Sequence, residues 1–316
     1  MKFKKPKFWD YEKPNFFSYL LLPLSFFLII LKYFKTITAP KTKKLNIKTI
    51  CVGNIYLGGT GKTSLSIKIN QILNKKKIKT CFIKKNYTNQ TDEQKILENN
   101  GKLFKSAKRI SALYEAMSND YQVAILDDGL QDPSINYDLR FVCFNTINWI
   151  GNGLVIPAGP LREGLNNLKK YKHIFLNGNM ENIENIKKII LEINPEINIY
   201  IGEYKLLNIN EFNLKEKFIV FSGIGNHKTF ISTLKKNNFK IIKDIEFPDH
   251  YNYSKKDIKK ILELAKSLNA EILTTEKDYM RIGENFQKEI NCFKISLKID
   301  QLDEINNKIK KLYESI

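Results

Sequence analysis

The sequence predicts an α/β protein in which helices cover parallel β-sheets. Three observations predict this class. An uncharged apolar stretch lies near the N-terminus, and a glycine-rich loop between a strand and a helix follows it. Over the rest of the 316 residues, short β-rich runs alternate with helical stretches. Strands that alternate with helices pair in parallel, because each helix carries the chain back to the same edge of the sheet.

The apolar stretch covers residues 14–31, PNFFSYLLLPLSFFLIIL, and lysines flank it on both sides. A helix of this length reaches ~27 Å, close to the thickness of a bilayer core. Three interpretations compete: a cleavable signal peptide, a buried helix of a soluble domain, and a membrane helix that spans the bilayer or lies in its interface. A signal peptide fits poorly because no small-residue cleavage site follows. We expect a membrane-associated helix within residues 1–36.

The glycine-rich loop, GGTGKT, follows the apolar run 50–52. A strand, such a loop and then a helix form a phosphate-binding loop, in which backbone N–H groups and the helix N-terminus attract phosphate oxygens. Lys62 is expected to contact the β- and γ-phosphates of a nucleoside triphosphate, and Thr63 to bind Mg²⁺. Tyr56 stands where the full pattern has its first glycine. The expected nucleotide-binding residues are Gly58, Gly59, Thr60, Gly61, Lys62, Thr63 and Ser64.

Beyond residue 36, β-rich runs and helical patterns follow one another. They are too many for one sheet, so we expect a P-loop NTPase-like domain over residues 37–200 and a second, smaller α/β domain over residues 201–316. The last long helix follows a Ser254–Asp257 capping box. The expected strands are 49–52, 80–83, 123–126, 141–144, 173–176, 197–201, 218–221, 240–242 and 271–274, and the expected helices are 63–74, 109–117, 183–193, 228–236 and 255–268.

Several carboxylates lie where strands end. Asp127 and Asp128 follow the apolar run 123–126, as in a Walker-B element, so one of them is expected to meet Mg²⁺ and the other to order the loop or the substrate. Asp92, next to Glu93, follows another strand through a polar loop. From chemistry alone, Asp92 is either the base that accepts a proton from an alcohol or a plain helix cap.

Two further positions are weaker candidates. Glu163 ends the rigid segment Pro157–Glu163 and is either a site residue or part of a structural turn. His250 lies beside Asp249 in a loop before the capped helix. A histidine paired with a carboxylate can orient that group or raise its basicity, although a lone histidine is usually structural.

The formal net charge of +19 comes from lysines spread along the whole chain. It favours an anionic partner, such as a membrane surface, an acidic lipid or nucleic acid. No zinc-finger spacing or RNA-binding aromatic signature accompanies the charge, so we expect no nucleic acid partner. The four cysteines are far apart, which favours buried thiols in a reducing compartment over disulfides or a metal site.

Taken in order, these motifs resemble the tetraacyldisaccharide 4′-kinase family, the lipid A 4′-kinases of Gram-negative bacteria. The resemblance covers nearly the whole chain, and its specificity lies in the order of the motifs. Members of this family usually also lack the first glycine of the loop pattern, at the position where this chain has Tyr56. The matching pieces are the N-terminal apolar helix, Val52–Asn54 with the glycine-rich loop, Asp92 and Glu93, Asp127–Gln131, Pro157–Glu163, Phe221–Asn226, Asp249 and His250, and Thr275–Asp278.

The resemblance implies a kinase that transfers the γ-phosphate of ATP to the 4′-hydroxyl of a tetraacyl glucosamine disaccharide 1-phosphate in lipid A biosynthesis. It implies ATP and Mg²⁺ as cofactors, and a lipid substrate met at a membrane surface, the cytoplasmic face of the bacterial inner membrane. We expect a monomer, although the sequence leaves the oligomeric state open. By position, Asp92 is the catalytic base, His250 its partner and Lys62 a catalytic phosphate contact. Thr63, Asp127 and Asp128 are implied to hold the metal, and Tyr87, Glu93, Arg109 and Glu163 to contact the substrate.

Three positions depart from the family pattern. Lys85 replaces an arginine, Thr91 a glycine and Asp132 a histidine. Lysine keeps the charge of arginine but loses its planar fork. Two alternatives to the kinase remain: a membrane-associated P-loop switch ATPase without a small-molecule acceptor, and a basic nucleic-acid-binding NTPase. A pairing of Asp92 with His250 favours the kinase, because a switch ATPase needs no base directed at an alcohol. The sequence leaves acyl-chain specificity open.

Overall fold

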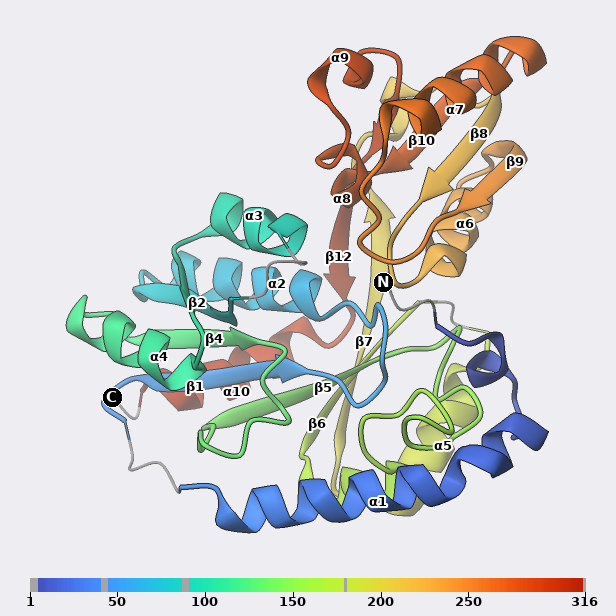
Figure 1. Cartoon of the computed structure of the whole chain (residues 1–316). Coiled ribbons are helices and arrows are strands. Elements are labelled where there is room, and N and C mark those ends of the chain that lie inside the picture. Colours follow the sequence, from blue (N-terminus) through green and yellow to red (C-terminus); the bar gives the residue numbers. More distant parts are fainter. Residues whose placement is uncertain (1–4, 41–44, 87–90, 179–180, 315–316) are drawn as a thin grey trace. The chain divides into compact units, whose positions relative to one another are not determined.

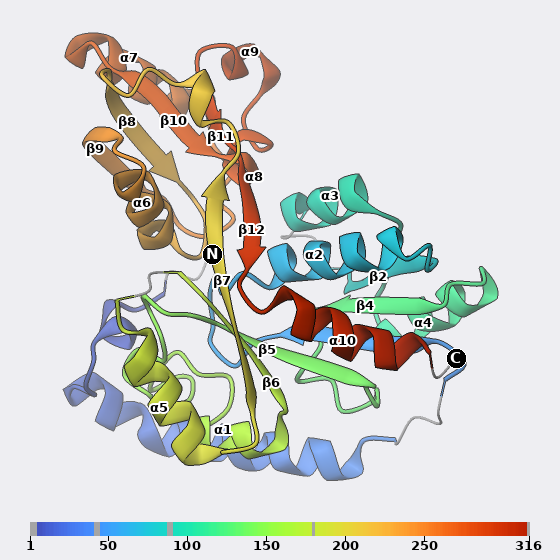
Figure 2. The same cartoon turned by 180° about the vertical axis from the view of Figure 1, so that it is seen from behind.

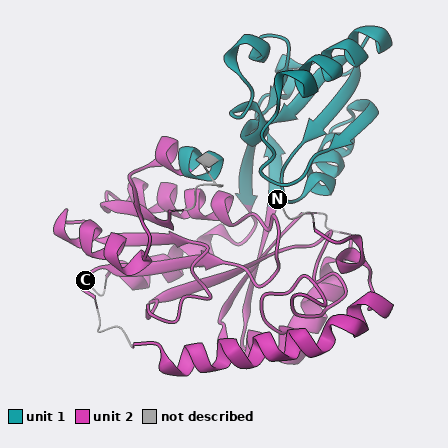
Figure 3. Cartoon of the chain, viewed as in Figure 1, with its two compact units in different colours: residues 1–4, 88–96, 203–298 teal, residues 5–87, 97–202, 299–316 magenta. Residues whose placement is uncertain are grey.

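The computed structural model describes residues 5–40, 45–86, 91–178 and 181–314. The chain divides into two compact units, coloured separately in Figure 3. The first, called the P-loop unit here, comprises residues 5–87, 97–202 and 299–316. The second unit comprises residues 1–4, 88–96 and 203–298. The predicted boundary at residue 200 stays a prediction, and the chain returns to the P-loop unit near its C-terminus.

The P-loop unit contains most of an eight-stranded sheet with the order β12-β7-β6-β5-β1-β4-β2-β3 (Figures 1 and 2). By the bounds of the two units, β7 continues into the second unit and β12 belongs to it up to residue 298. The pairings from β7 through to β3 are parallel. The central strands are nearly continuous apolar runs, as expected where both faces of a sheet are covered. The strands are β1 (Lys48–Gly53), β2 (Thr80–Lys85), β3 (Leu103–Ser106), β4 (Val123–Asp127), β5 (Leu139–Asn145), β6 (His173–Asn177), β7 (Asn198–Leu206) and β12 (Ile295–Ile299).

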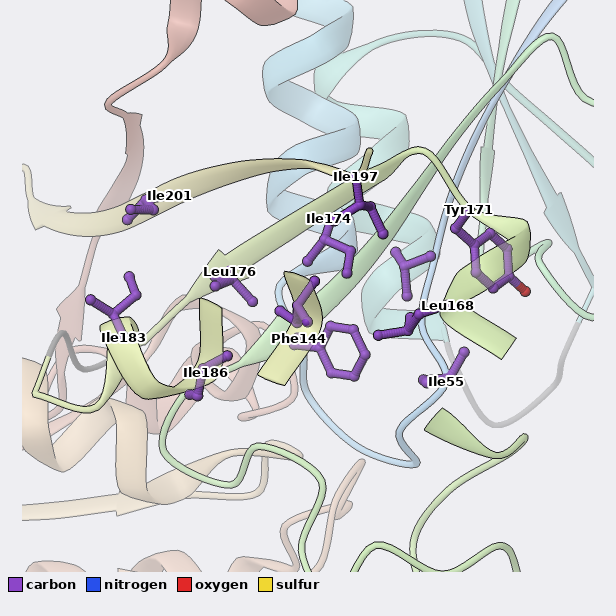
Figure 4. Close-up of a cluster of buried hydrophobic side chains, with 12 residues drawn as sticks. Ile55, Phe144, Leu168, Tyr171, Ile174, Leu176, Ile183, Ile186, Ile197 and Ile201 are labelled. Atoms are coloured by element: carbon purple, nitrogen blue, oxygen red, sulfur yellow. The ribbon is translucent and has the colours of Figure 1, made fainter. Parts of the chain in front are cut away.

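The helices of this unit complete two apolar cores. Helix α4 packs its alanine and leucine side chains on β2 and β4. Helix α5 packs Ile183, Ile186 and Ile190 on β5 and β6. Figure 4 shows Ile183 and Ile186 in this cluster with Leu176 and Phe144. The helices are α1 (Phe16–Thr38), α2 (Lys62–Lys75), α4 (Arg109–Ser118), α5 (Ile183–Ile193) and α10 (Leu302–Tyr313), with short 3₁₀ turns η1 (Lys7–Asp10) and η2 (Leu165–Lys170); α3 (Thr91–Asn100) begins in the second unit and ends in this one.

The second unit has a four-stranded parallel sheet with the order β11-β10-β8-β9. Alternate residues of β8 enter different cores: Ile219 and Phe221 pack with α7, and Phe218 and Val220 pack with α6. Because successive side chains of a strand point to opposite faces, α6 and α7 cover opposite faces of this sheet. The elements are η3 (Ile209–Glu211), β8 (Lys217–Ser222), α6 (His227–Lys236), β9 (Lys240–Glu246), α7 (Lys255–Leu268), β10 (Glu271–Thr275), α8 (Glu276–Tyr279), α9 (Glu284–Gln287) and β11 (Asn291–Phe293).

Helix α1 is an apolar helix of 23 residues with Pro23 inside it, and it is long and apolar enough to cross a membrane by length and composition. It is not a buried core helix, because only 11% of its most apolar window is buried. Two serines, Ser18 and Ser25, are its buried residues. The Ser25 hydroxyl donates to the Val155 carbonyl (2.8 Å) and accepts from the Ala158 N–H (3.0 Å). Helix α1 is therefore attached to the P-loop unit by a narrow polar face.

Candidate functional site

The glycine-rich loop connects β1 to α2 and is shaped by buried amide side chains. The Asn54 side chain donates to the Gly58 carbonyl (3.2 Å) and to the Thr60 hydroxyl (2.9 Å). The Asn177 amide at the end of β6 donates to the Thr60 carbonyl (2.6 Å). Gly61, with φ of 76°, lies in the left-handed region that favours glycine, and α2 begins at the next residue, Lys62. The N-terminus of α2 therefore adds its partial positive charge beside Lys62 and Thr63.

Tyr56, which replaces the first glycine of the loop pattern, is a structural residue. Its ring is buried in a small cluster with Val155 and Leu161. Its hydroxyl donates to Asp10 (2.9 Å). The backbone at Tyr56 also bridges Leu161. At the position of the missing glycine, the Tyr56 side chain therefore connects the phosphate loop to the segment that contains Glu163.

The two aspartates at the end of β4 have different partners. Asp127 pairs in register with Val52 of β1, which places it beside the start of the phosphate loop. Its Oδ2 atom lies 2.6 Å from the Lys84 ammonium group, and both side chains are almost fully buried. Its Oδ1 atom is buried without a hydrogen-bond partner among the residues that the structure describes.

Asp128 has a backbone φ of 61°, an uncommon conformation for a residue with a side chain. Its Oδ1 atom accepts from the Arg162 guanidinium (2.6 Å) and lies 3.8 Å from the Lys62 ammonium group. Burial works to raise the pKa of Asp128, but the charges of Lys62 and Arg162 hold it well below its usual range. Asp128 is therefore an ionised partner of the loop lysine.

Arg109 and Glu163 also lie in this cluster. Arg109, the first residue of α4, donates to the Asp128 carbonyl and lies 3.4 Å from Asp132. Asp132, where the family pattern has histidine, thus forms an ion pair in this chain. Glu163 accepts from the Gln131 amide and from the Tyr171 hydroxyl, both at 3.0 Å.

A second cluster forms within the second unit around Asp92, in the first turn of α3. Asp92 is 4% exposed. Its Oδ1 atom lies 2.9 Å from the His250 Nδ1 atom, and its Oδ2 atom accepts from the Arg281 guanidinium. The neighbouring Glu93 lies 3.2 Å from the Lys277 ammonium group. The structure therefore pairs Asp92 with His250, although 158 residues separate them in the sequence.

The electrostatics of this pair follow from its partners. Burial works to raise the pKa of Asp92, but the hydrogen bond from His250 and the charge of Arg281 hold it well below its usual range. Burial works to lower the pKa of His250, but the hydrogen bond to Asp92 and the charge of Asp249 raise it above its ordinary value. The pair is thus an ionised carboxylate beside a histidine that protonates readily.

The chain is similar to known proteins over nearly its whole length. A family model described as tetraacyldisaccharide-1-P 4′-kinase matches residues 17–314. A protein of Pelagibacter ubique (strain HTCC1062) named tetraacyldisaccharide 4′-kinase is 58% identical over 314 residues, covering 99% of each chain. One of Rickettsia akari (strain Hartford) with the same name is 33% identical over 331 residues, covering 98% of each.

The chain belongs to the tetraacyldisaccharide 4′-kinase family. The resemblance inferred from the motifs is confirmed, and the chain is an enzyme of the kinase class. A solved structure of LpxK from Aquifex aeolicus in complex with ATP superimposes with a TM-score of 0.69 at 21% identity, covering 94% of this chain and 99% of that chain. This likeness confirms the predicted α/β fold.

The structure gathers the predicted site residues of this kinase into two clusters, one in each unit. Tyr87 lies outside the described residues. Four basic residues in the clusters received no role from the sequence. Arg162 and Lys277 lie inside motifs that were recognised, and Lys84 opens the loop that departs from the family pattern. Arg281 lies beyond the Thr275–Asp278 motif, where no local signal marks it.

Proposed function

We propose that the chain transfers the γ-phosphate of ATP to the 4′-hydroxyl of a tetraacyl glucosamine disaccharide 1-phosphate. The observation that carries this proposal is the buried contact between Asp92 and His250, at 2.9 Å, in a chain that also has a Gly-Lys-Thr phosphate loop. A phosphate loop serves any user of nucleoside triphosphates. An ionised carboxylate held in position to accept a proton is needed where the acceptor is an alcohol.

On the donor side, we assign the triphosphate to residues 58–64 and the N-terminus of α2. Lys62 balances charge on the β- and γ-phosphates, and Asp128, which is itself paired with Arg162, lies 3.8 Å from the Lys62 ammonium group. The residues fit a magnesium ion, because the Asp127 Oδ1 atom is buried and has no hydrogen-bond partner among the described residues. Thr63 and Asp127 would hold that ion, with Asp128 close by, and bound Mg²⁺ neutralises charge on the transferred phosphate.

On the acceptor side, Asp92 is the general base. Its carboxylate accepts the proton of the 4′-hydroxyl while the hydroxyl oxygen forms a bond to the γ-phosphorus and ADP departs with the bridging oxygen. His250 holds the carboxylate through Nδ1 and stabilises its negative charge. Glu93, Arg109 and Glu163 are assigned to the polar part of the lipid by their positions in the motifs, and so is Tyr87.

We also propose that α1 lies in the membrane interface rather than across the bilayer. Ser18, Ser25 and Lys32 follow one another at seven-residue spacing, and each bonds to the segment 152–162: Ser18 to Asn152 (2.9 Å), Ser25 to Val155 (2.8 Å) and Lys32 to the Arg162 carbonyl (2.6 Å). A helix that crossed the bilayer would carry this polar segment into hydrocarbon, at high cost. We further propose that the chain acts as a monomer on the cytoplasmic face of the inner membrane, because ATP is available on that face.

The proposal is tested by incubating the full chain with ATP labelled at the γ-phosphate, Mg²⁺ and a panel of lipid disaccharide phosphates. We expect a labelled phosphomonoester on the tetraacyl disaccharide 1-phosphate. Asp92→Asn should lower its formation by ~10²–10⁴, the range for general base catalysis, with unchanged ATP affinity. Glu98→Gln, an exposed change on the same helix, serves as the matched control. ATP hydrolysis without any labelled lipid would instead identify a switch ATPase.

A further inference from the structure

Arg281 lies just beyond α8, and its side chain is 8% exposed. The Nη1 atom donates to the Gly223 carbonyl (2.7 Å) and to Asp278 Oδ1 (3.0 Å), and the Nη2 atom donates to Asp92 Oδ2. One guanidinium group therefore joins the loop after β8, the short helix α8 and the first turn of α3. These three segments are far apart in the sequence, and Arg281 lies 189 residues from Asp92.

The anchor of Arg281 is itself tightly fixed. Asp278, which is fully buried, accepts from the Gly223 N–H (2.9 Å), the Tyr253 hydroxyl (2.8 Å) and the Thr275 hydroxyl (2.6 Å). A planar guanidinium held by an immobile carboxylate offers its remaining donors in a fixed direction. Arg281 is thus a preorganised group rather than a mobile surface cation.

The Gly223 carbonyl connects Arg281 to His250. It accepts from Arg281 Nη1 and from the His250 backbone N–H (3.0 Å). A Cβ atom at Gly223 would lie 3.0 Å from the Pro248 carbonyl oxygen and from the Tyr251 Cβ atom, so a larger residue would require these neighbours to shift by a few tenths of an ångström. The backbone of His250 and the guanidinium group of Arg281 are therefore held by the same carbonyl oxygen.

The Asp92 carboxylate is divided between these two residues. Oδ2 is held by Arg281, and Oδ1 is thereby presented to His250 Nδ1. We propose that Arg281 is a positioning residue for the kinase reaction, which fixes the Asp92 carboxylate so that one oxygen stays aligned with His250. This inference rests on the proposed role of Asp92 as the base. In this role Arg281 acts through Asp92.

The inference predicts the direction of a titration. Arg281 Nη2 lies 3.5 Å from His250 Nδ1, so its charge by itself disfavours protonated His250. If Arg281 were only a nearby charge, its removal would raise the pKa of His250. If Arg281 holds Asp92 in place, its removal separates the pair, and the pKa of His250 falls toward the ordinary value of ~6.5. The charged groups around His250 are Asp92 and Glu93 on α3, Asp249 beside it, and Lys277, Asp278 and Arg281 around α8.

The test is an NMR titration of the imidazole C–H signals in the full chain without nucleotide. The chain has three histidines, so His173 and His227 report whether each unit remains folded. Asp92→Asn defines the midpoint of His250 without the Asp92 carboxylate, while Asp249 remains beside it. For Arg281→Met, we expect the His250 midpoint to fall at least halfway toward that of Asp92→Asn. Arg281→Lys, which keeps the charge but loses the fork, should fall between Arg281→Met and wild type. Lys277→Met, which removes a cation paired with Glu93, should not lower the midpoint.

A rise or no change of the His250 midpoint in both Arg281 variants, with the His173 and His227 signals unchanged, would overturn the inference. If Arg281→Met fails to fold, Arg281→Lys decides alone. Kinase assays on the same variants separate this inference from the proposed function. We expect kcat to fall at least ~10-fold in Arg281→Met, with unchanged KM for ATP. An Asp92→Asn enzyme with wild-type transfer would refute the base assignment, whatever the titration of the Arg281 variants shows.

Discussion

At the scale of single residues, buried charges of opposite sign mark both clusters. Lys84 and Asp127 form such a pair in the P-loop unit, with side chains 1% and 0% exposed. In the second unit, Asp92 lies between His250 and Arg281. A buried ion pair adds little net stability, but removing one partner leaves a buried charge without compensation. These positions therefore respond to substitution far more strongly than the exposed lysines that dominate the composition.

Lys84→Met is expected to lower the free energy of unfolding by ~3–5 kcal/mol, because it leaves the Asp127 carboxylate buried without its cation. Urea unfolding at pH 7 measures the change. The double variant Lys84→Met, Asp127→Asn should recover part of the loss, since it removes the orphaned charge. A loss below ~1 kcal/mol for the single variant, or no recovery in the double variant, would contradict this account of the pair.

His250→Gln should lower the melting temperature most between about pH 4 and pH 6.5. The raised pKa of His250 gives a contribution to stability that is complete below its ordinary pKa and lost as pH rises through the folded value. The lowered pKa of Asp92 gives a contribution that is present above its ordinary pKa and lost as pH falls. Both contributions are complete only between the two ordinary pKa values.

Thermal melts of wild type and His250→Gln across this range measure the window. His173 is a suitable control, because burial lowers its pKa to about 4 and its protonation below pH 6.5 destabilises the fold. The difference in melting temperature between wild type and His173→Gln should therefore change with falling pH in the direction opposite to that for His250→Gln. A His250→Gln difference that does not vary with pH would show that the pairing adds no pH-dependent stability.

At the scale of elements, α1 is attached to its unit by hydrogen bonds that apolar residues cannot replace. Ser25→Val should lower the free energy of unfolding by ~1–3 kcal/mol, because it leaves the buried Ala158 N–H without an acceptor. Chemical unfolding followed by tryptophan fluorescence measures this loss, since Trp9 contacts Pro157 in the same segment. Thr36→Val, at an exposed position of α1, should change the free energy by less than ~0.5 kcal/mol. Equal effects would show that the Ser25 contacts do not stabilise the attachment.

The helices and strands also show how much of the secondary structure local sequence patterns predict. All nine expected strands and all five expected helices are present within a few residues of their expected ends. The Ser254–Asp257 capping box is confirmed. Strands β3, β11 and β12, of four, three and five residues, were missed. Helix α10 was missed although Leu302, Ile305, Ile309 and Leu312 repeat at helical spacing. Helix α3 has only two apolar residues, Ile96 and Leu97, so its sequence gives no amphipathic pattern.

At the scale of the whole molecule, the exposed side of α1 gives the proposed membrane association a direct test. Leu20, Phe27 and Phe34 are 65%, 56% and 58% exposed, and they lie about 200° around the helix from Ser18, Ser25 and Lys32. Changing all three to Glu should release the chain from anionic vesicles in flotation, because it removes apolar area and repels the surface. The melting temperature should stay within about 2 °C of wild type, since none of the three bonds to the unit.

Tyr114→Glu, at an exposed aromatic position on α4, controls for added negative charge and should leave vesicle binding intact. Full binding of the α1 triple variant would assign attachment to another surface of this strongly basic chain. Release that is accompanied by a lower melting temperature would instead trace the effect to damage of the fold.

The sequence by itself determined the features that depend on neighbours in the chain. Strand and helix periodicity gave the α/β class, glycines and Lys62 gave the phosphate loop, and the order of motifs gave the family. Only the tertiary structure decided which charges meet. The partnership of Lys84 with Asp127 and that of Arg281 with Asp92 join residues on separate elements, 43 and 189 positions apart. Local spacing cannot encode such contacts, because they arise only when strand order and loop paths bring distant side chains into one buried volume.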